Sequence, residues 1–231
     1  MKKLLFFCVV LFLFNAGAGK SAELNLNQIT DEQEFKQIIN EIEEHREQIR
    51  TFSAEFDQVK TIMPFEETEK ANGVFFYKKP MKVVWEFYAP EKNMVILKEN
   101  RGFIVTPNLK QVQLFSMEQN NRFKFLLAGL GEPLSKFFVE FNVLCFKGED
   151  KSGKFYLFRL SPKDPEMAQI MDNFEVKVSC VNMVPSSTKL VEKTGDITTL
   201  TFSQIKINPN IKESVFEYKI PPAYEIIDYR E

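Results

Sequence analysis

The first regular pattern in the chain is a stripe of apolar residues at helical spacing. Charged residues fill the positions between the apolar ones, as is typical of an amphipathic helix. Thr30 stands three residues before Gln33, a spacing that resembles the capping box at the start of a helix. The pattern predicts a helix from about Thr30 to Arg50 whose apolar face carries Phe35, Ile38, Ile39, Ile42 and Ile49.

The period changes from Ser53 onward, where apolar and polar residues begin to alternate. Such alternation predicts strands, and Gly, Pro and Asn mark the turns between them. The connections are too short to hold crossover helices, so neighbouring strands should pair antiparallel. Six strands are predicted in this part of the chain: residues 55–62, 73–79, 82–88, 93–99, 102–107 and 110–117.

A less regular stretch at residues 118–138 interrupts the strands. It predicts a short helix that is ended by Gly129 and Gly131, with Phe123, Leu126, Leu127 and Leu130 on one face. A second short helix is expected within residues 161–172. The strands that resume after the interruption are predicted at residues 136–146, 154–162, 173–181, 188–195, 196–208 and 215–228.

These elements predict one mainly β domain over residues 19–231. A long antiparallel sheet of about eleven strands twists and must close or half-close. We therefore expect an unclosed antiparallel half-barrel capped by a few helices. Strand alternation places Phe75 and Tyr77 on one face, opposite Val74, Phe76 and Lys78. The interior is filled either by these side chains or by a ligand.

The N-terminus has the pattern of a secretory signal peptide. Lys2 and Lys3 precede an apolar core at residues 4–14, and Ala16-Gly17-Ala18 supplies small residues for cleavage. We expect residues 1–18 to be removed and the protein to be exported. The alternative is an uncleaved anchor.

Two cysteines, Cys145 and Cys180, remain after that leader. An oxidising compartment permits a disulfide between them. Two buried free thiols fit the sequence equally well, and the sequence does not choose between these alternatives.

Charge and motifs exclude several classes of function. The 30 basic and 32 acidic residues give a net charge of -2, so no nucleic-acid partner is expected. The sequence contains no dinucleotide, P-loop or nucleophile-elbow motif, and its one histidine, His45, lies on the predicted helix. We expect no catalytic residues, no metal site and no cofactor, and interpret the chain as a binding protein.

Several short motifs follow each other in the order found in one protein family. They begin with Phe52, Ala54, Phe56 and Gln58 in the pattern F-x-A-x-F-x-Q, and continue with Gly73 and the YKKP of residues 77–80. Further matching segments are Val84-Trp85-Glu86, Pro90, Met94-Val95-Ile96, Pro107, Gln111-Val112, LLAGLGEPLSKFF and FEYKIPPAYEIID. Nearly the whole mature chain resembles the LolA family, the periplasmic carriers of outer-membrane lipoproteins.

The resemblance implies a function and a set of site residues. It implies that a cavity receives the acyl chains of a lipoprotein from an inner-membrane lipoprotein-releasing transporter and delivers them to an outer-membrane acceptor, with the carrier acting as a monomer. The expected lid residues are Phe35, Ile38, Phe123, Leu126 and Leu127. The expected cavity lining is Phe56, Phe75, Tyr77, Val84, Met94, Ile96, Phe103, Val105 and Phe202.

One departure from the family pattern concerns the lid. Many members carry an arginine just before the tryptophan, where it helps to hold the lid closed, and this chain has Val84 there. We therefore expect a different latch or a different cargo. The open alternatives are a carrier of another lipid or glycolipid, a lipid-sensing regulatory protein, and a structural protein whose side chains fill its own core.

Overall fold

The computed structural model describes residues 25–117 and 133–230. Three α-helices and two 3₁₀ turns are present there: α1 (Glu32–Gln48), α3 (Leu134–Glu140), α4 (Pro165–Ala168), η1 (Pro107–Leu109) and η2 (Glu213–Phe216). The first seven strands are β1 (Leu26–Gln28), β2 (Thr51–Ile62), β3 (Glu67–Lys78), β4 (Lys82–Ala89), β5 (Asn93–Lys98), β6 (Arg101–Thr106) and β7 (Gln111–Ser116). The other strands are β8 (Phe141–Asp150), β9 (Gly153–Pro162), β10 (Met171–Ser179), β11 (Pro185–Glu192), β12 (Ile197–Ile207) and β13 (Glu225–Asp228).

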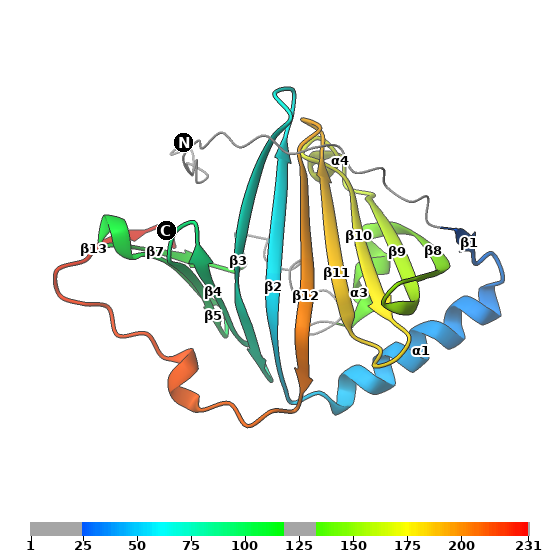
Figure 1. The fold of residues 1–231 in the computed structure, drawn as a ribbon, viewed down its shortest axis with the longest axis horizontal. Helices are drawn as coiled ribbons and strands as arrows, with labels where there is room; N and C mark the ends of the chain where they lie inside the picture. The colour runs from blue at the N-terminus through cyan, green and yellow to red at the C-terminus, as the bar shows by residue number, and fades with distance from the viewer. Residues whose placement is uncertain (1–24, 118–132, 231) are drawn as a thin grey trace.

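All of these strands belong to one curved sheet (Figure 1). Its order is β1-β8-β9-β10-β11-β12-β2-β3-β4-β5-β6-β7-β13, so β1 and β13 are its two edges and the sheet does not close. Pairing is antiparallel except for β13, which lies parallel to β7. The prediction of a mainly β, unclosed half-barrel with few helices is confirmed, with thirteen strands in the described part of the chain.

Two antiparallel runs form the sheet, and they meet in its middle. Strands β2 to β7 follow one another, as do β8 to β12. The last strand of the second run, β12, pairs with the first strand of the first run, β2, with Phe202 opposite Phe56. This long-range pair makes one continuous surface of two runs that are far apart in the sequence.

Helix α1 begins one residue later than its sequence suggests. The side chain of Asp31, and not that of Thr30, accepts the capping hydrogen bond, from the backbone N–H of Glu34 at 2.7 Å. Asp31 has an extended conformation there, as an N-cap requires. The helix ends at Gln48, slightly before the predicted end at Arg50.

Two predicted strands are wrong in part. Residues 134–140 form α3, because Leu134, Phe137 and Phe141 recur at helical spacing and are all buried in the same cluster. Residues 215–228 are a strand only at their end, where β13 pairs with β7. Pro221 and Pro222 have no N–H to donate to a ladder, and the chain before β13 instead crosses the sheet.

The side chains of the sheet separate into an inner and an outer face. The inner face, which α1 covers in part, carries two clusters. The first, here called the helix cluster, joins α1 and α3 to β8–β10 through Ile29, Ile38, Ile39, Ile42, Leu134, Phe137, Phe141, Cys145, Phe158, Leu160, Met171, Phe174, Val176, Val178 and Met183. The second, here called the aromatic cluster, contains Ile49, Phe52, Ala54, Phe56, Phe75, Tyr77, Val83, Trp85, Leu97, Phe115, Met117, Val184 and Leu200.

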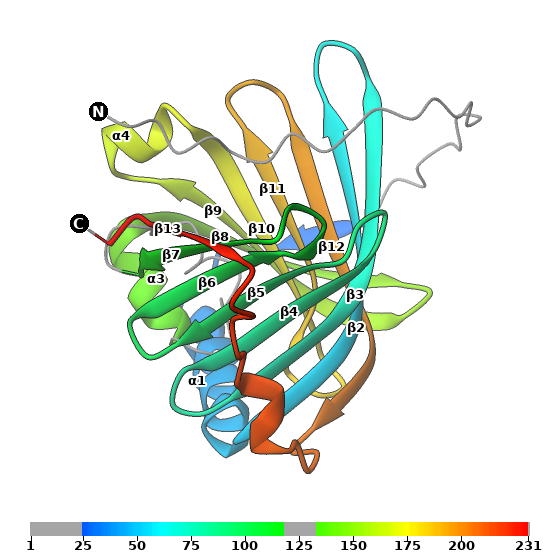
Figure 2. The same ribbon diagram turned by 90° about the vertical axis from the view of Figure 1, so that its left-hand side faces the viewer.

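A third cluster lies on the outer face of β4–β7. It buries Val84, Ile96, Val105, Val112, Leu114 and Phe216. Phe216 belongs to the C-terminal segment, residues 209–224, which runs across β4–β6 on its way to β13, whereas α1 lies behind these strands (Figure 2). The outer face of β4–β6 is therefore covered by the C-terminal segment, whereas α1 lies on the inner side of the sheet.

The predicted leader, residues 1–18, lies outside the described residues, as does the predicted helix that ends at Gly129 and Gly131. None of the helices in residues 25–117 and 133–230 combines the length and hydropathy needed to cross a membrane.

Candidate functional site: the inner face and its helical cover

The aromatic cluster is held together by ring-to-ring contacts across neighbouring strands. Phe75 lies at its centre, with ring centroids 4.4 Å from Trp85, 5.9 Å from Phe52 and 6.1 Å from Phe202. Phe56 meets Phe87 edge-to-face at 5.0 Å. Such tilted and edge-to-face contacts are the favoured arrangements of aromatic pairs. The result is a broad apolar surface on the inner side of β2, β3 and β4.

Strand alternation and register produce this surface. Ala54, Phe75 and Trp85 are cross-strand partners on β2, β3 and β4, so their side chains share one face. Gly73 continues the same row beside a β-bulge. A Cβ there would lie 1.9 Å from the carbonyl oxygen of Glu86, so only glycine allows this close approach of β3 and β4.

Helix α1 covers the adjoining half of the inner face. Its buried residues Ile38, Ile39 and Ile42 all belong to the helix cluster. Phe35 stacks against Phe138 of α3 with ring centroids 5.5 Å apart. The aromatic cluster receives only Ile49 from this part of the chain, so α1 lies beside that cluster and not over its centre.

The C-terminal end of α1 is fastened to the sheet through its backbone. The Lys79 ammonium, in the β3–β4 turn, donates to the carbonyl oxygens of Glu47 at 2.8 Å and Arg46 at 3.2 Å. Asn208 adds two bonds, accepting from the N–H of Arg50 and donating to the carbonyl of Gln48. Burial lowers the pKa of Lys79, and the nearby charge of Arg46 acts in the same direction.

Side chains fasten the rest of the helix. The carboxylate of Glu43 accepts from the backbone N–H of Leu134 at the start of α3 and from Arg46. Near the N-terminus of α1, Glu34 pairs with Lys147 of β8. Both of these side chains are almost half exposed, whereas the Glu43–Arg46 pair is largely buried. Exposed pairs contribute little. Directly before α1, however, β1 pairs with β8 and the N–H of Ile29 donates to the carbonyl oxygen of Cys145 at 2.9 Å, so the helix is fastened at both ends.

The structure divides the nine expected lining residues between the two faces. Four of them lie in or against the aromatic cluster on the inner face: Phe56, Phe75, Tyr77 and Phe202. Five lie in or against the outer cluster: Val84, Met94, Ile96, Phe103 and Val105. The predicted orientation of Phe75 and Tyr77 is confirmed. Strand register explains the division. Tyr77 pairs with Val83, and Val83 pairs with Leu97, so these three side chains share the inner face. Val84 and Ile96 are their immediate neighbours in sequence and therefore point to the outer face.

Position 84 lies on the face of the sheet opposite helix α1. Val84 is 1% exposed and lies in the outer cluster, opposite the face that α1 covers. A side chain at this position points away from α1, and the expectation of a different latch or a different cargo stays a prediction. The hydrogen bonds of Lys79 and Asn208, in contrast, reach the C-terminal end of α1.

Two of the five expected lid residues can be placed. Ile38 is buried in the helix cluster and Phe35 packs against it. The other three, Phe123, Leu126 and Leu127, lie outside the described residues.

Cys145 and Cys180 are free thiols in this structure. They lie two strands apart, with Cys145 opposite Phe158 of β9 and Cys180 bonded through its N–H to Lys154. A disulfide needs directly apposed Cβ atoms, and this offset of four residues along β9 does not provide that. The sequence left open a disulfide or two free thiols, and the structure contains two free thiols.

Sequence reasoning omitted several residues that face the aromatic cluster: Phe52, Val83, Trp85, Leu97 and Phe115. The sequence contains a signal for three of them. Side chains two residues apart in a strand share a face, and short hairpins link β3 to β4 and β4 to β5, so a count that starts at Phe75 reaches Trp85, Val83 and Leu97. The count needs the number of residues in each turn; between β3 and β4 the pairing then keeps one register from Lys78 back to Gly73.

Comparison with known proteins agrees with this architecture. The family model described as outer membrane lipoprotein carrier protein LolA matches residues 47–219. The outer-membrane lipoprotein carrier proteins of Chromohalobacter salexigens and Hahella chejuensis are 25% and 27% identical over 184 and 182 residues, each match covering 78% of this chain and 82% of the relative. The crystal structure of an uncharacterized conserved protein from Thermus thermophilus is 11% identical and matches with a TM-score of 0.57 over 85% of this chain and 99% of that one, a likeness of fold. The resemblance read from the sequence is confirmed, and the chain belongs to the LolA family of outer membrane lipoprotein carrier proteins.

Proposed function

We propose that this protein is a periplasmic carrier that binds the acyl chains of a lipoprotein against the aromatic cluster and shuttles them from the inner to the outer membrane. The observation that supports this most is the continuous apolar inner face of the aromatic cluster, with α1 beside it. It binds its cargo and catalyses no reaction. Family membership supports the same class of cargo.

A carrier needs an affinity that allows release. Burial of each acyl methylene contributes about 0.8 kcal/mol, so complete burial of several chains would bind almost irreversibly. The ring of Phe75 packs against those of Phe52 and Trp85. Binding must replace part of this packing, and that cost brings the net affinity into a range from which an outer-membrane acceptor can remove the cargo. An inner-membrane transporter supplies the cargo to a monomeric carrier.

The single tryptophan provides a direct test. Trp85 is 2% exposed and lies within the aromatic cluster, so acyl chains bound there would contact it. Brominated acyl chains quench tryptophan fluorescence at contact. A triacylated lipopeptide with brominated chains should quench Trp85 strongly and saturably, whereas the same lipopeptide without bromine should not.

Matched variants locate the site. Phe202→Asp places a charge on a half-buried ring position of the inner face and should weaken quenching by about tenfold or more. Phe65→Asp is the control, because Phe65 is 76% exposed in the β2–β3 turn. Equal quenching in both variants, or none in the unmodified protein, would contradict the proposal.

The identity of the cargo needs a separate experiment in the cell. Depletion of the protein should cause lipoproteins to accumulate in the inner membrane. Mass spectrometry of lipids that co-purify with the periplasmic protein would distinguish this cargo from a phospholipid or a glycolipid. Normal lipoprotein distribution together with a co-purified glycolipid would favour the alternative carrier.

A further inference from the structure

The outer face of β3–β6 carries a row of like charges on directly opposed residues. Lys78 pairs with Lys82, Lys82 with Lys98, and Lys98 with Arg101, so four neighbouring strands each place one cation at the same level. Alternation confirms the face, because Phe76, Val84, Ile96 and Phe103 lie on it two residues away in each strand. Opposed like charges destabilise a sheet, so such a row calls for anions to balance it.

The protein supplies only one carboxylate to this row, as far as the described residues show. Glu213 of η2 pairs with both Lys78 and Lys82. Lys98 and Arg101 make no ion pair with any residue in the described part of the chain. Glu213 of the C-terminal segment thus balances the positive charges of Lys78 and Lys82. The charges of Lys98 and Arg101 are available to an external anion.

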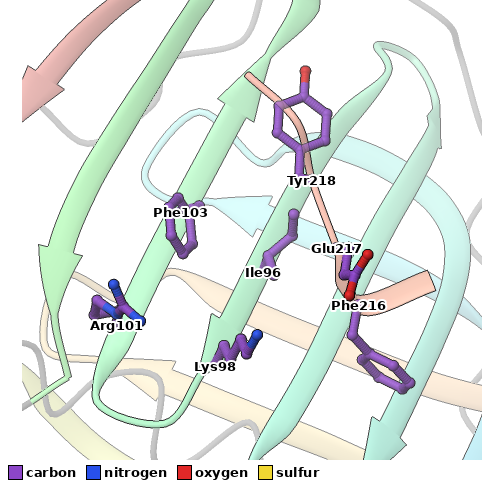
Figure 3. Close-up of a pocket in the computed structure, with 7 residues that line it drawn as sticks. All are labelled: Ile96, Lys98, Arg101, Phe103, Phe216, Glu217 and Tyr218. Atoms are coloured by element: carbon purple, nitrogen blue, oxygen red, sulfur yellow. The ribbon is translucent and has the colours of Figure 1, made fainter. Parts of the chain in front are cut away.

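A pocket of about 280 Å³ lies at the unbalanced half, between the C-terminal segment and β5–β6 (Figure 3). This volume is close to the lower end of the range for small-molecule sites. Lys98 and Arg101 lie together at one end, and Ile96 and Phe103 extend from them along the sheet. The lining is completed by three residues of the C-terminal segment: Phe216, Glu217 and Tyr218.

We propose that this outer pocket binds the anionic headgroup of a single-chain amphiphile, with a phosphate or carboxylate on Lys98 and Arg101 and the first part of its chain against Ile96, Phe103 and Tyr218. Arg101 can form two parallel bonds with such a group, and Lys98 adds a second charge. Glu217 also lines the pocket and is exposed, but no ion pair joins it to Lys98 or Arg101 in the described part of the chain. The site is separate from the proposed acyl-chain site because the two lie on opposite faces of the sheet.

A recess, rather than a flat surface, favours a single molecule over a membrane. The cations line a pocket that the C-terminal segment overhangs, and Ile96 and Phe216 beneath it are 3% and 2% exposed. A lipid bilayer would contact projecting charges, whereas a recess with aromatic walls can receive one headgroup with its chain.

The test uses the full protein with dodecyl phosphate below its micellar concentration, followed by NMR. The amide signals of Gly102 and Tyr218 report on the outer pocket, and the indole signal of Trp85 reports on the inner face. We expect saturable shifts at Gly102 and Tyr218, with affinity at least about tenfold lower in the double variant K98Q/R101Q. K206Q, which changes an exposed lysine of β12 without an ion pair in the described structure, should change the affinity by less than about twofold.

Three further arms, on the unmodified protein, allow the proposal to fail even if a variant misfolds. Dodecyl maltoside tests the charge, and equal shifts at Gly102 would overturn the anion site. Inorganic phosphate tests the apolar walls, and equal affinity would overturn the amphiphile. Phosphatidylglycerol vesicles test the membrane: binding to vesicles without binding of monomeric dodecyl phosphate would overturn the pocket. Shifts at Trp85 alone would likewise overturn the proposal while leaving the acyl-chain site intact.

Discussion

Among single residues, Asp150 gives the clearest dependence on pH. Burial would raise its pKa, but hydrogen bonds from Lys177 and Ser152 outweigh burial and hold the pKa at about 2. Because this value is below that of an unfolded aspartate, the ionised carboxylate stabilises the fold fully above about pH 4, and this contribution is lost as the pH falls toward 2.

Asp150→Asn should therefore be less stable than the unmodified protein at pH 7, by about 1 kcal/mol, and the difference should shrink at pH 2.5. Urea unfolding at both pH values measures it. Asp57→Asn is the control, because Asp57 is exposed and makes no ion pair with described residues. A constant difference for Asp150→Asn across this range would show that its charge has no role.

The two thiols should differ in reactivity. Burial raises the pKa of Cys145 to about 12, and it raises the pKa of the half-exposed Cys180 less strongly, against a hydrogen bond from Tyr156. Since the thiolate is the reactive form, iodoacetamide at pH 8 should modify Cys180 at least about tenfold faster than Cys145. Peptide mass spectrometry of the non-reduced protein measures both rates. A linked Cys145–Cys180 peptide would contradict the free thiols.

Residue patterns predict which side chains of one strand share a face, but they do not predict which face the side chains of the next strand share with them. Phe75 and Tyr77 were placed correctly because the alternation in β3 is unbroken. Val84 and Ile96 were placed on the wrong face because a turn of one more or one fewer residue reverses every side chain that follows. Apolar residues cover both faces of β4–β6, so hydrophobicity alone gives no warning of the reversal.

At the level of elements, the C-terminal segment acts as a cover for the outer face. Phe216 is its main anchor, being 2% exposed in the outer cluster. Phe216→Ala should lower the free energy of unfolding by about 3 kcal/mol, through lost burial and the cavity left behind. Ile226→Ala, at a side chain that is 53% exposed in β13, should cost about 0.5 kcal/mol or less. Urea unfolding measures both, and equal costs would mean that the segment is not anchored at η2.

The same segment shows why elements are harder to predict than fold class. Its residues have the composition of a strand, yet most of them pack across β4–β6 and only residues 225–228 join the sheet. Similarly, α3 has strand-like residues, but Leu134 and Phe137 are buried beside α1. In both places contacts with distant parts of the chain override the local preference. The helix α1 was predicted well because its apolar stripe is long and regular.

In the molecule as a whole, the fastening of α1 suggests how the inner face could be opened. Its C-terminal end continues almost directly into β2 and is held by Lys79 and Asn208, so it is suited to be the hinge. Its N-terminal part is tied to the sheet by the exposed pair between Glu34 and Lys147 and by β1, which precedes the helix and pairs with β8. Motion about this hinge would separate β1 from β8 and α1 from β8–β10, and would widen access to the aromatic cluster.

Lys147→Gln removes the ion pair with Glu34, leaves the backbone pairing of β1 with β8 in place, and should speed acyl-chain entry. An exposed pair contributes about 0.2–1 kcal/mol, which corresponds to roughly a twofold to fivefold shift toward the open state. The rate of Trp85 quenching by the brominated lipopeptide should rise by this factor at low salt, and the difference should disappear in concentrated salt, which screens the pair. Lys36→Gln is the matched control, because Lys36 pairs with Glu32 within α1 and that pair moves with the helix. If both variants speed quenching equally, the helix does not swing away from β8, and cargo must reach the inner face by another route.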